Sequence, residues 1–247
     1  MKETTRKILL ALYPIEDKQP FLTRAQLLAL LPQLTPAGFN SLLFLLEKKE
    51  YLLRQELNQQ VVYSLSAYGV SELEEQFPAL SAARRQWRGE WSVIMFLKAP
   101  SSDQNYRYLR TFLLSHGCFA FKRGVFLYPG EPGDLLLKEL RGSYRQSVAV
   151  LGSDKWLFGD ERIIIGQKIG LQDSLGLYSG ISNELERLIT IDGSKKEFHD
   201  QSKSDFNSIF DRFVQTLAED SGLMKHYYPQ VKGALDLLAD LQKLAEI

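Results

Sequence analysis

The stretch that most constrains the fold is residues 34–65, where an amphipathic helix pattern is followed at once by two short strand patterns. Thr35 is a good N-cap residue, and Pro36 has the fixed φ that suits a first helical position. Apolar residues then recur with the spacing i, i+3, i+4, i+7: Phe39, Leu42, Leu43 and Leu46. This spacing predicts that one stripe of the helix is buried and the opposite face is free. The free face carries Ala37, Ser41, Phe44 and Lys48.

Helix and strand signals surround this stretch in a recognisable order. Residues 6–13 favour a short helix that ends at Pro14, residues 24–31 a second helix with Thr23 as N-cap, and the third helix extends to about Glu50. Residues 51–57 and 61–65 then predict two strands joined by a polar turn. Three helices and a β-hairpin are the order of a winged helix-turn-helix. We therefore predict a DNA-binding domain of this type over residues 1–80.

The second segment, residues 81–152, alternates strands and helices. The predicted elements are a strand at 91–97, a helix at 105–115, strands at 118–122 and 125–128, a helix at 135–141 and a strand at 146–151. This βαββαβ order is the ferredoxin-like plan, in which two helices cover one face of an antiparallel sheet. We interpret the segment as a dimerisation or scaffold domain.

The third segment, residues 153–247, predicts a mainly helical C-terminal domain, where effector or dimer contacts are possible. Helical spacing is found at 205–217 and 231–245, and a short helix is expected at 184–188. The run 161–165 favours a strand or a buried turn, and the polar run 192–204 a linker or mobile loop. The fold class predicted for the whole chain is α+β.

The charge of the chain is zero in total but unevenly distributed. Residues 1–80 hold 8 Lys+Arg and 9 Asp+Glu, residues 81–152 hold 11 and 5, and residues 153–247 hold 11 and 16. A basic middle segment beside an acidic end indicates either a surface for an anionic partner or attraction between domains. The distribution leaves both alternatives open.

Several classes of protein are disfavoured by the sequence. No apolar run approaches the roughly 18 residues of a membrane span, and the N-terminus has no cleavage site typical of a signal peptide, so we expect a cytoplasmic protein without membrane contacts. Cys118 lies in an apolar run and is interpreted as a buried strand residue. His116, His199 and His226 are too scattered to predict a metal site. We expect no metal and no cofactor.

The order of these segments and their local motifs resemble the PaaX family, bacterial repressors first known from phenylacetate degradation. The resemblance covers nearly the whole chain and is most specific in the middle. The motifs are Trp87-Arg88-Gly89-Glu90-Trp91 before the first strand, Arg107-Tyr108-Leu109-Arg110 on a helix, Gly117-Cys118-Phe119, and Gly124-Val125-Phe126-Leu127-Tyr128-Pro129. In the first segment, the run from Tyr63 to Gly69 resembles the exit from a winged helix. The resemblance implies a dimeric repressor that binds double-stranded DNA at a palindromic operator.

The predicted recognition helix departs from the family pattern, in which Ser or Thr is commonly followed by arginines. Here Gly38, Phe39, Asn40 and Ser41 stand at those positions. Without arginine we expect no bidentate contact to guanine from this face, whereas Asn40 can pair with adenine, and Ser41 or Phe44 can touch a base edge or a thymine methyl group. The residues predicted to bind DNA are Arg24, Thr35, Asn40, Ser41, Phe44, Lys48, Lys49, Arg54, Gln59 and Gln60.

The middle segment also suggests a small-molecule effector. The best-known members of the family respond to aryl-acetyl coenzyme A thioesters, so the resemblance implies that a group of basic residues binds an acyl-CoA or other effector: Arg107, Arg110, Lys122 and Arg123. Salt bridges to the acidic third segment are the structural alternative for the same residues.

We expect no enzymatic activity. The middle segment is similar to the small CRISPR-associated spacer-acquisition protein, whose relatives include metal-dependent nucleases. Such a nuclease needs a carboxylate at the end of the first strand to hold Mg²⁺. Here the strand ends in Leu97-Lys98-Ala99-Pro100, and Asp103 lies beyond the turn.

Two functions follow from the sequence. The first is a DNA-binding regulator, a dimeric repressor of a catabolic operon that is released by a small ligand. The second is a protein-interaction module that keeps the fold but has lost specific DNA readout. The second interpretation depends on Phe44 and Leu45, because adjacent apolar side chains on the DNA face need either a base or a protein partner.

Overall fold

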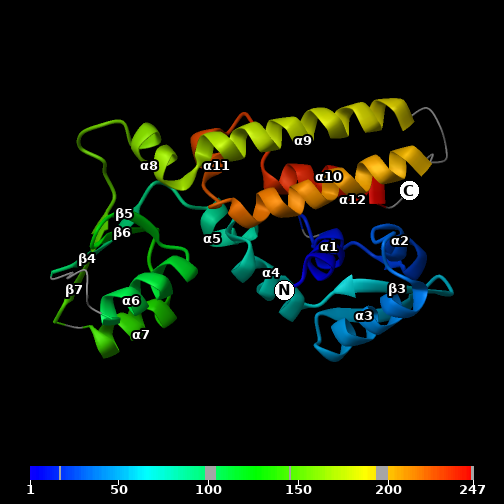
Figure 1. Cartoon of the computed structure of the whole chain (residues 1–247), viewed down its shortest axis with the longest axis horizontal. Helices are drawn as coiled ribbons and strands as arrows, with labels where there is room; N and C mark the ends of the chain where they lie inside the picture. The colour runs from blue at the N-terminus through cyan, green and yellow to red at the C-terminus, as the bar shows by residue number, and fades with distance from the viewer. Residues whose placement is uncertain (17, 98–103, 145, 193–199, 246–247) are drawn as a thin grey trace. The chain divides into compact units, whose positions relative to one another are not determined.

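The computed structural model describes residues 1–16, 18–97, 104–144, 146–192 and 200–245. The protein is of mixed α+β class with two small antiparallel sheets, which confirms the predicted class (Figure 1). Two compact units are present. Unit 1 combines residues 1–81 with residues 174–247, and unit 2 comprises residues 82–173. The division of the sequence into three domains stays a prediction.

The first part of unit 1 contains α1 (Glu3–Ala11), β1 (Leu22–Thr23), α2 (Arg24–Ala29), α3 (Pro36–Lys48), β2 (Leu52–Leu57), β3 (Gln60–Leu65), α4 (Ala67–Gln76) and the 3-10 helix η1 (Pro78–Leu80). Local signals place the helix starts. Thr23 forms a capping box with Gln26 at the start of α2, and the Thr35 side chain accepts a hydrogen bond from the Gly38 N–H at the start of α3. Both predicted N-caps are therefore confirmed.

The sheet of unit 1 has the strand order β1-β3-β2, with both neighbours antiparallel. The β2–β3 hairpin closes where Leu57 pairs with Gln60. Asn58 and Gln59 between them have φ values of 50° and 65°, as a tight two-residue hairpin turn requires. The sequence predicted this hairpin with boundaries that differ by only one residue.

The described residues of the second part of unit 1 contain α9 (Leu171–Asp192), whose first three residues belong to unit 2, α10 (Asp200–Glu219), α11 (Met224–Tyr227) and α12 (Ala234–Ala245). In the described part of the chain, no helix is long and apolar enough to cross a membrane.

Helix α9 corrects the prediction of a short helix at 184–188. It has 22 residues and continues through Gly176 and Gly180. A buried stripe at helical spacing overrides their low helix propensity: Tyr178, Ile181, Leu185 and Leu188.

The predicted linker at 192–204 is also corrected in part. Residues 193–199 lie outside the described residues, whereas α10 already begins at Asp200 and continues through the end of the predicted linker. The helix expected at 205–217 is thus the inner part of a longer one.

Helix α1 joins the two parts of unit 1. Four of its side chains and the residue after it are almost completely buried: Ile8, Leu9, Leu10, Ala11 and Leu12. The helix contacts both α10 and α12. The Lys7 Nζ donates to Asp211 Oδ1 at 2.6 Å, and the Gln242 amide donates to the backbone oxygens of Leu10 and Tyr13 at 3.0 and 2.8 Å. Residues from the two ends of the sequence therefore share one core.

Unit 2 contains α5 (Ala82–Arg85), β4 (Trp91–Phe96), α6 (Gln104–Ser115), β5 (Phe119–Lys122), β6 (Val125–Pro129), α7 (Asp134–Ser143), β7 (Val148–Ser153) and α8 (Glu161–Ile169). The sheet order is β5-β6-β4-β7, and every neighbouring pair is antiparallel. The core joins both long helices to the sheet through Ile94, Leu109, Leu113, Cys118, Phe126, Leu136 and Leu140. Cys118 is buried as predicted, although it immediately precedes β5.

Helix α8 corrects the strand or turn predicted at 161–165. Three consecutive isoleucines, residues 163–165, favour a strand by their β-branched side chains. Asp160, however, caps the helix by accepting a hydrogen bond from the Ile163 N–H at 3.1 Å. Lys98 and Asp103, on which the argument against a nuclease rests, lie outside the described residues.

Candidate nucleic-acid interface

The exposed face of α3 is the centre of the candidate site. Phe39, Leu43 and Leu46 are buried, as the spacing predicted, and Leu42 is half-buried. The opposite face is exposed: Ala37, Asn40, Ser41, Phe44 and Lys48. Its largest apolar group, Phe44, exposes 65% of its surface. A helix with this division has one side fixed to the protein and one side available to a partner.

Two hydroxyl groups of this region are partly used by the helix itself. Thr35 Oγ1 caps α3, so its hydroxyl hydrogen stays available to an acceptor such as a phosphate oxygen. Ser41 donates to the backbone oxygen of Ala37 at 3.1 Å, which leaves its oxygen available as an acceptor. Thr35 can therefore act as a donor to DNA, whereas Ser41 can act as an acceptor.

Arg24 and Asn40 form a pair across the α2–α3 turn. The Arg24 Nε–H donates to the Asn40 Oδ1 at 2.8 Å, and both residues are exposed. Both residues were predicted to bind DNA, but their pairing was not predicted, because 16 positions separate them in the sequence. Only the angle at which α2 and α3 meet brings the arginine to the side of α3.

The β2–β3 hairpin, which we call the wing, carries the next group of predicted residues. Arg54 on β2 is exposed and pairs in register with Tyr63 on β3, and Gln59 and Gln60 are exposed at the tip. The wing also exposes apolar side chains: Leu53, Leu57 and Val61. Its solvent-facing surface is thus mixed, with one cation and several polar and apolar groups.

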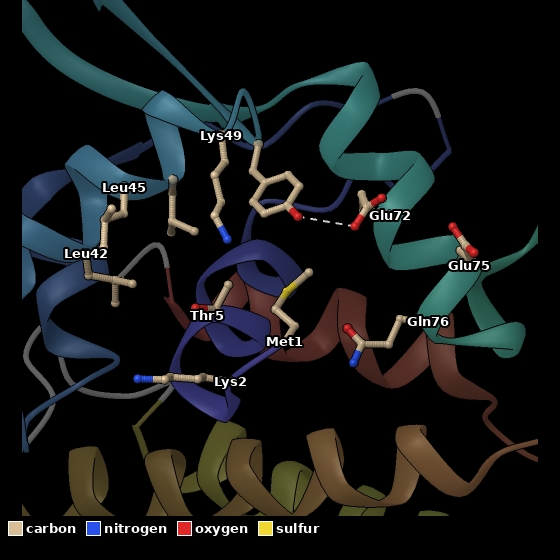
Figure 2. A pocket seen from close by; sticks show the side chains of 11 residues that line it. Met1, Lys2, Thr5, Leu42, Leu45, Lys49, Glu72, Glu75 and Gln76 are labelled. Atoms are coloured by element: carbon tan, nitrogen blue, oxygen red, sulfur yellow. Dashed lines mark hydrogen bonds between the residues drawn. The ribbon is translucent and has the colours of Figure 1, made fainter. Parts of the chain in front are cut away.

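Lys48 and Lys49 are exposed at the C-terminal end of α3. Lys49 also lines a cavity of about 770 Å³ between α1, α3 and α4 (Figure 2). In Figure 2 Leu42 and Leu45 lie on one side of this cavity and Glu72 on the other, where the Tyr51 hydroxyl donates to Glu72 Oε2 at 3.2 Å. The cavity is lined by groups of both charge signs, so it does not extend the basic surface.

The predicted effector residues all lie on the surface of unit 2. Arg107 and Arg110 are exposed on α6, and Lys122 and Arg123 are exposed at the β5–β6 turn. The Gly124 N–H donates to the Tyr106 hydroxyl at 3.1 Å, which ties this turn to the first part of α6. Two cavities of about 450 Å³ in this unit lie elsewhere, one beside α7 and one at the ends of β4 and β7. The effector assignment stays a prediction.

One buried cation of unit 2 was not identified from the sequence. Arg84 is 7% exposed, and its Nη2 donates to the Gly117 backbone oxygen at 2.9 Å. Its guanidinium lies 4.7 Å from the centre of the Tyr128 ring and 5.8 Å from that of Phe119. Burial lowers the pKa of Arg84. These contacts indicate a structural role, because aromatic rings and a carbonyl oxygen surround the charge.

No protein-family model and no curated protein matches this chain. Among solved structures, the chain is similar to the uncharacterized protein Rv0674 from Mycobacterium tuberculosis, with 17% sequence identity and a TM-score of 0.46 over 100% of both chains. A similarity at this level supports no conclusion about function.

Proposed function

We propose that this protein is a DNA-binding transcriptional regulator of the PaaX type, a dimeric repressor that recognises double-stranded DNA through α3 and the wing. The observation that carries the proposal is the exposed face of α3, which presents polar, aromatic and basic side chains immediately beside an exposed hairpin. In this proposal α2 and α3 form a helix-turn-helix, α3 enters the major groove, and the wing contacts the adjacent backbone.

The arrangement of α1 to α3 and of the three-stranded sheet supports a winged helix. Residues 30–35 connect α2 and α3, a connection somewhat longer than the turn of about three to four residues typical of helix-turn-helix motifs. The side chains on the face of α3 that a DNA groove would meet are exposed, and Arg24 of α2 is hydrogen-bonded to one of them, Asn40. The α3 helix is long enough to cross a groove, because 13 residues extend about 20 Å at 1.5 Å per residue.

The electrostatic part of binding must come from local groups, because residues 1–80 have a slight excess of acidic side chains. Four cations lie at the interface: Arg24, Lys48, Lys49 and Arg54. Each neutralised phosphate contributes about −0.9 to the slope of log affinity against log salt concentration. Two subunits with three or four contacts each predict a slope of about −5 to −7.

The strand order of unit 2 supports its role as a ferredoxin-like module. Across the sheet the strands lie in the order β5-β6-β4-β7, which is the second, third, first and fourth strand along the chain, and α6 and α7 pack on the sheet. We propose that this module contributes to the homodimer and that an acyl-CoA or other small anionic effector binds the basic group of Arg107, Arg110, Lys122 and Arg123. A ligand acts on such a dimer only by binding two of its arrangements unequally.

DNA footprinting on the promoter of the protein's own gene tests the proposal. We expect a roughly symmetric protected site at moderate salt, with half-sites a whole number of helical turns apart. Arg54→Ala is expected to lower affinity for all sequences alike and to reduce the salt slope by about two, one contact per subunit. The absence of any protected site, together with no salt-dependent affinity for any duplex, would exclude DNA binding.

A second function is favoured by one observation. Phe44 and Leu45 are adjacent on α3 and expose 65% and 51% of their surfaces. An apolar pair of this kind also suits a protein partner, in which case the chain is a protein-interaction module. Phe44→Asp separates the two functions: loss of an assembly measured by light scattering supports protein contact, whereas an unchanged assembly with weakened DNA binding supports DNA contact. Leu177→Asp, at a 49% exposed position on α9 outside the proposed interface, is the matched control.

A further inference from the structure

The pairing of Arg24 with Asn40 fixes which hydrogen-bonding groups the α3 face can offer. The Arg24 Nε–H is donated to Asn40 Oδ1 at 2.8 Å. The two terminal Nη groups of the arginine stay available as donors, as does the Nδ2 group of the asparagine. Within the described ranges Arg24 makes no ion pair. The pair therefore presents mainly donors, and one of the two acceptor lone pairs of the asparagine oxygen is already occupied.

Guanine and adenine present different hydrogen-bonding groups in the major groove, and the Arg24–Asn40 pair can distinguish them. Guanine offers two acceptors, N7 and O6, whereas adenine offers the acceptor N7 and the donor N6–H₂. An asparagine that reads adenine needs its own oxygen to accept from N6. One of the two lone pairs of the Asn40 oxygen already accepts from Arg24, and the Nη fork of the arginine offers two donors that match the two acceptors of guanine.

We propose that Arg24 and Asn40 act together to recognise a guanine in each half-site, with Arg24 as the base-contacting residue and Asn40 as the positioning residue. The inference rests on the proposed function. It assigns the base to an arginine from α2, which compensates for the absence of arginine on α3 itself.

The position of the pair favours a base contact over a phosphate contact. Asn40 lies on the exposed face of α3 between Ala37 and Phe44, one turn away on either side. A hydrogen bond to Asn40 therefore directs the guanidinium toward the part of α3 that faces the groove. The methyl side chain of Ala37 leaves space beside it. Fixing the Nε also restricts the arginine before binding, so less side-chain entropy is lost when the base is contacted.

The experiment starts with selection of duplexes from a random pool by the full-length wild-type protein, followed by fluorescence anisotropy on the selected site. Arg24→Lys keeps the charge but loses the planar fork, so it is expected to lose the preference for one guanine per half-site while non-specific affinity persists. The expected loss at that position is about 5- to 150-fold. Arg187→Lys, at an exposed position on α9 outside the proposed interface, is the matched control and is expected to leave every base preference unchanged.

Two further measurements assign the contact. Replacing the preferred guanine by 7-deazaguanine removes the N7 acceptor and is expected to weaken binding of the wild type but not of Arg24→Ala. Asn40→Ala is expected to reduce the preference at the same guanine, because the arginine is no longer held.

The outcomes distinguish the inference from the proposed function. Selection of no duplex by the wild type overturns both. A selected site for which Arg24→Lys retains full guanine preference, or for which Asn40→Ala changes an adenine position independently of Arg24, overturns only the inference. Equal weakening of all duplexes by Arg24→Ala assigns the arginine to a phosphate and also overturns it.

Discussion

Replacing Asp211 with alanine tests whether the two ends of the chain fold as one unit. Lys7 on α1 is 2% exposed, and its ammonium group has three neighbours: Asp211 Oδ1 at 2.6 Å, the Asn207 backbone oxygen at 3.1 Å and the centre of the Phe210 ring at 5.4 Å. Burial lowers the pKa of Lys7, and the Asp211 carboxylate opposes that effect. Removing the carboxylate leaves a buried cation with one carbonyl partner.

The expected loss of stability on Asp211→Ala follows from the burial of Lys7 and Asp211. Breaking a fully buried ion pair costs about 3–5 kcal/mol. The Asp211 side chain is 45% exposed, so water replaces part of the lost interaction, and we expect a loss of about 2 kcal/mol for Asp211→Ala. Lys7→Met removes the charge together with its desolvation cost, so we expect a change within about 1 kcal/mol. The double variant is expected to resemble Lys7→Met.

Urea denaturation followed by circular dichroism measures these differences, with thermal unfolding as a second measurement. A loss of about 2 kcal/mol lowers the melting temperature by about 4–8 °C for a unit of this size. The reasoning is refuted if Lys7→Met destabilises the protein as much as Asp211→Ala does, or if Asp211→Ala leaves the denaturation midpoint unchanged.

Three other predictions concern single residues. Gly222 has a φ of 79°, and a Cβ there would lie 2.8 Å from a backbone oxygen of η1. Gly222→Ala should therefore lower the free energy of unfolding, measured by denaturant titration, by at least about 1–2 kcal/mol. Gly180 lies in open space on α9, so Gly180→Ala should raise the free energy of unfolding by about 0.5–1 kcal/mol. Burial raises the pKa of Cys118 to about 12, so its thiol should resist a disulfide reagent at pH 8 in the native protein and react after unfolding; rapid native labelling would contradict this burial. Burial raises the pKa of Asp220, which accepts a hydrogen bond from the Tyr178 hydroxyl at 2.8 Å. Its contribution to stability is therefore present below the ordinary carboxyl pKa of about 3.9 and is lost as pH rises through the raised pKa. Asp220→Asn should remove this dependence of the free energy of unfolding on pH. An unchanged pH dependence in the variant would contradict this prediction.

Local sequence signals were enough to predict the helices and the hairpin of the candidate interface. Thr23 and Thr35 are side-chain caps that act within one turn of their helices, and the i, i+3, i+4, i+7 spacing of α3 predicted its buried and exposed faces. The hairpin was found for the same reason, since a polar turn between two β-rich runs is a local pattern.

Patterns that depend on distant packing were misread. A short helix was predicted at 184–188, but the buried stripe of α9 keeps one helix continuous through Gly176 and Gly180. The isoleucines at 163–165 indicated a strand, but the cap at Asp160 and the surrounding packing give a helix. Secondary-structure propensities differ by about 1 kcal/mol or less per residue, so tertiary contacts override them.

The sequence by itself determined the class of the fold, the position of the exposed face on α3 and most of the residues proposed to contact DNA, because each depends on spacing and chemistry within a few turns. Only the tertiary structure decided that the N-terminal helix and the C-terminal helices share a core, through contacts such as Lys7 with Asp211. It alone also placed the guanidinium of Arg24 against Asn40. Both results depend on the angle and contact between separate helices, and no local pattern of residues specifies these.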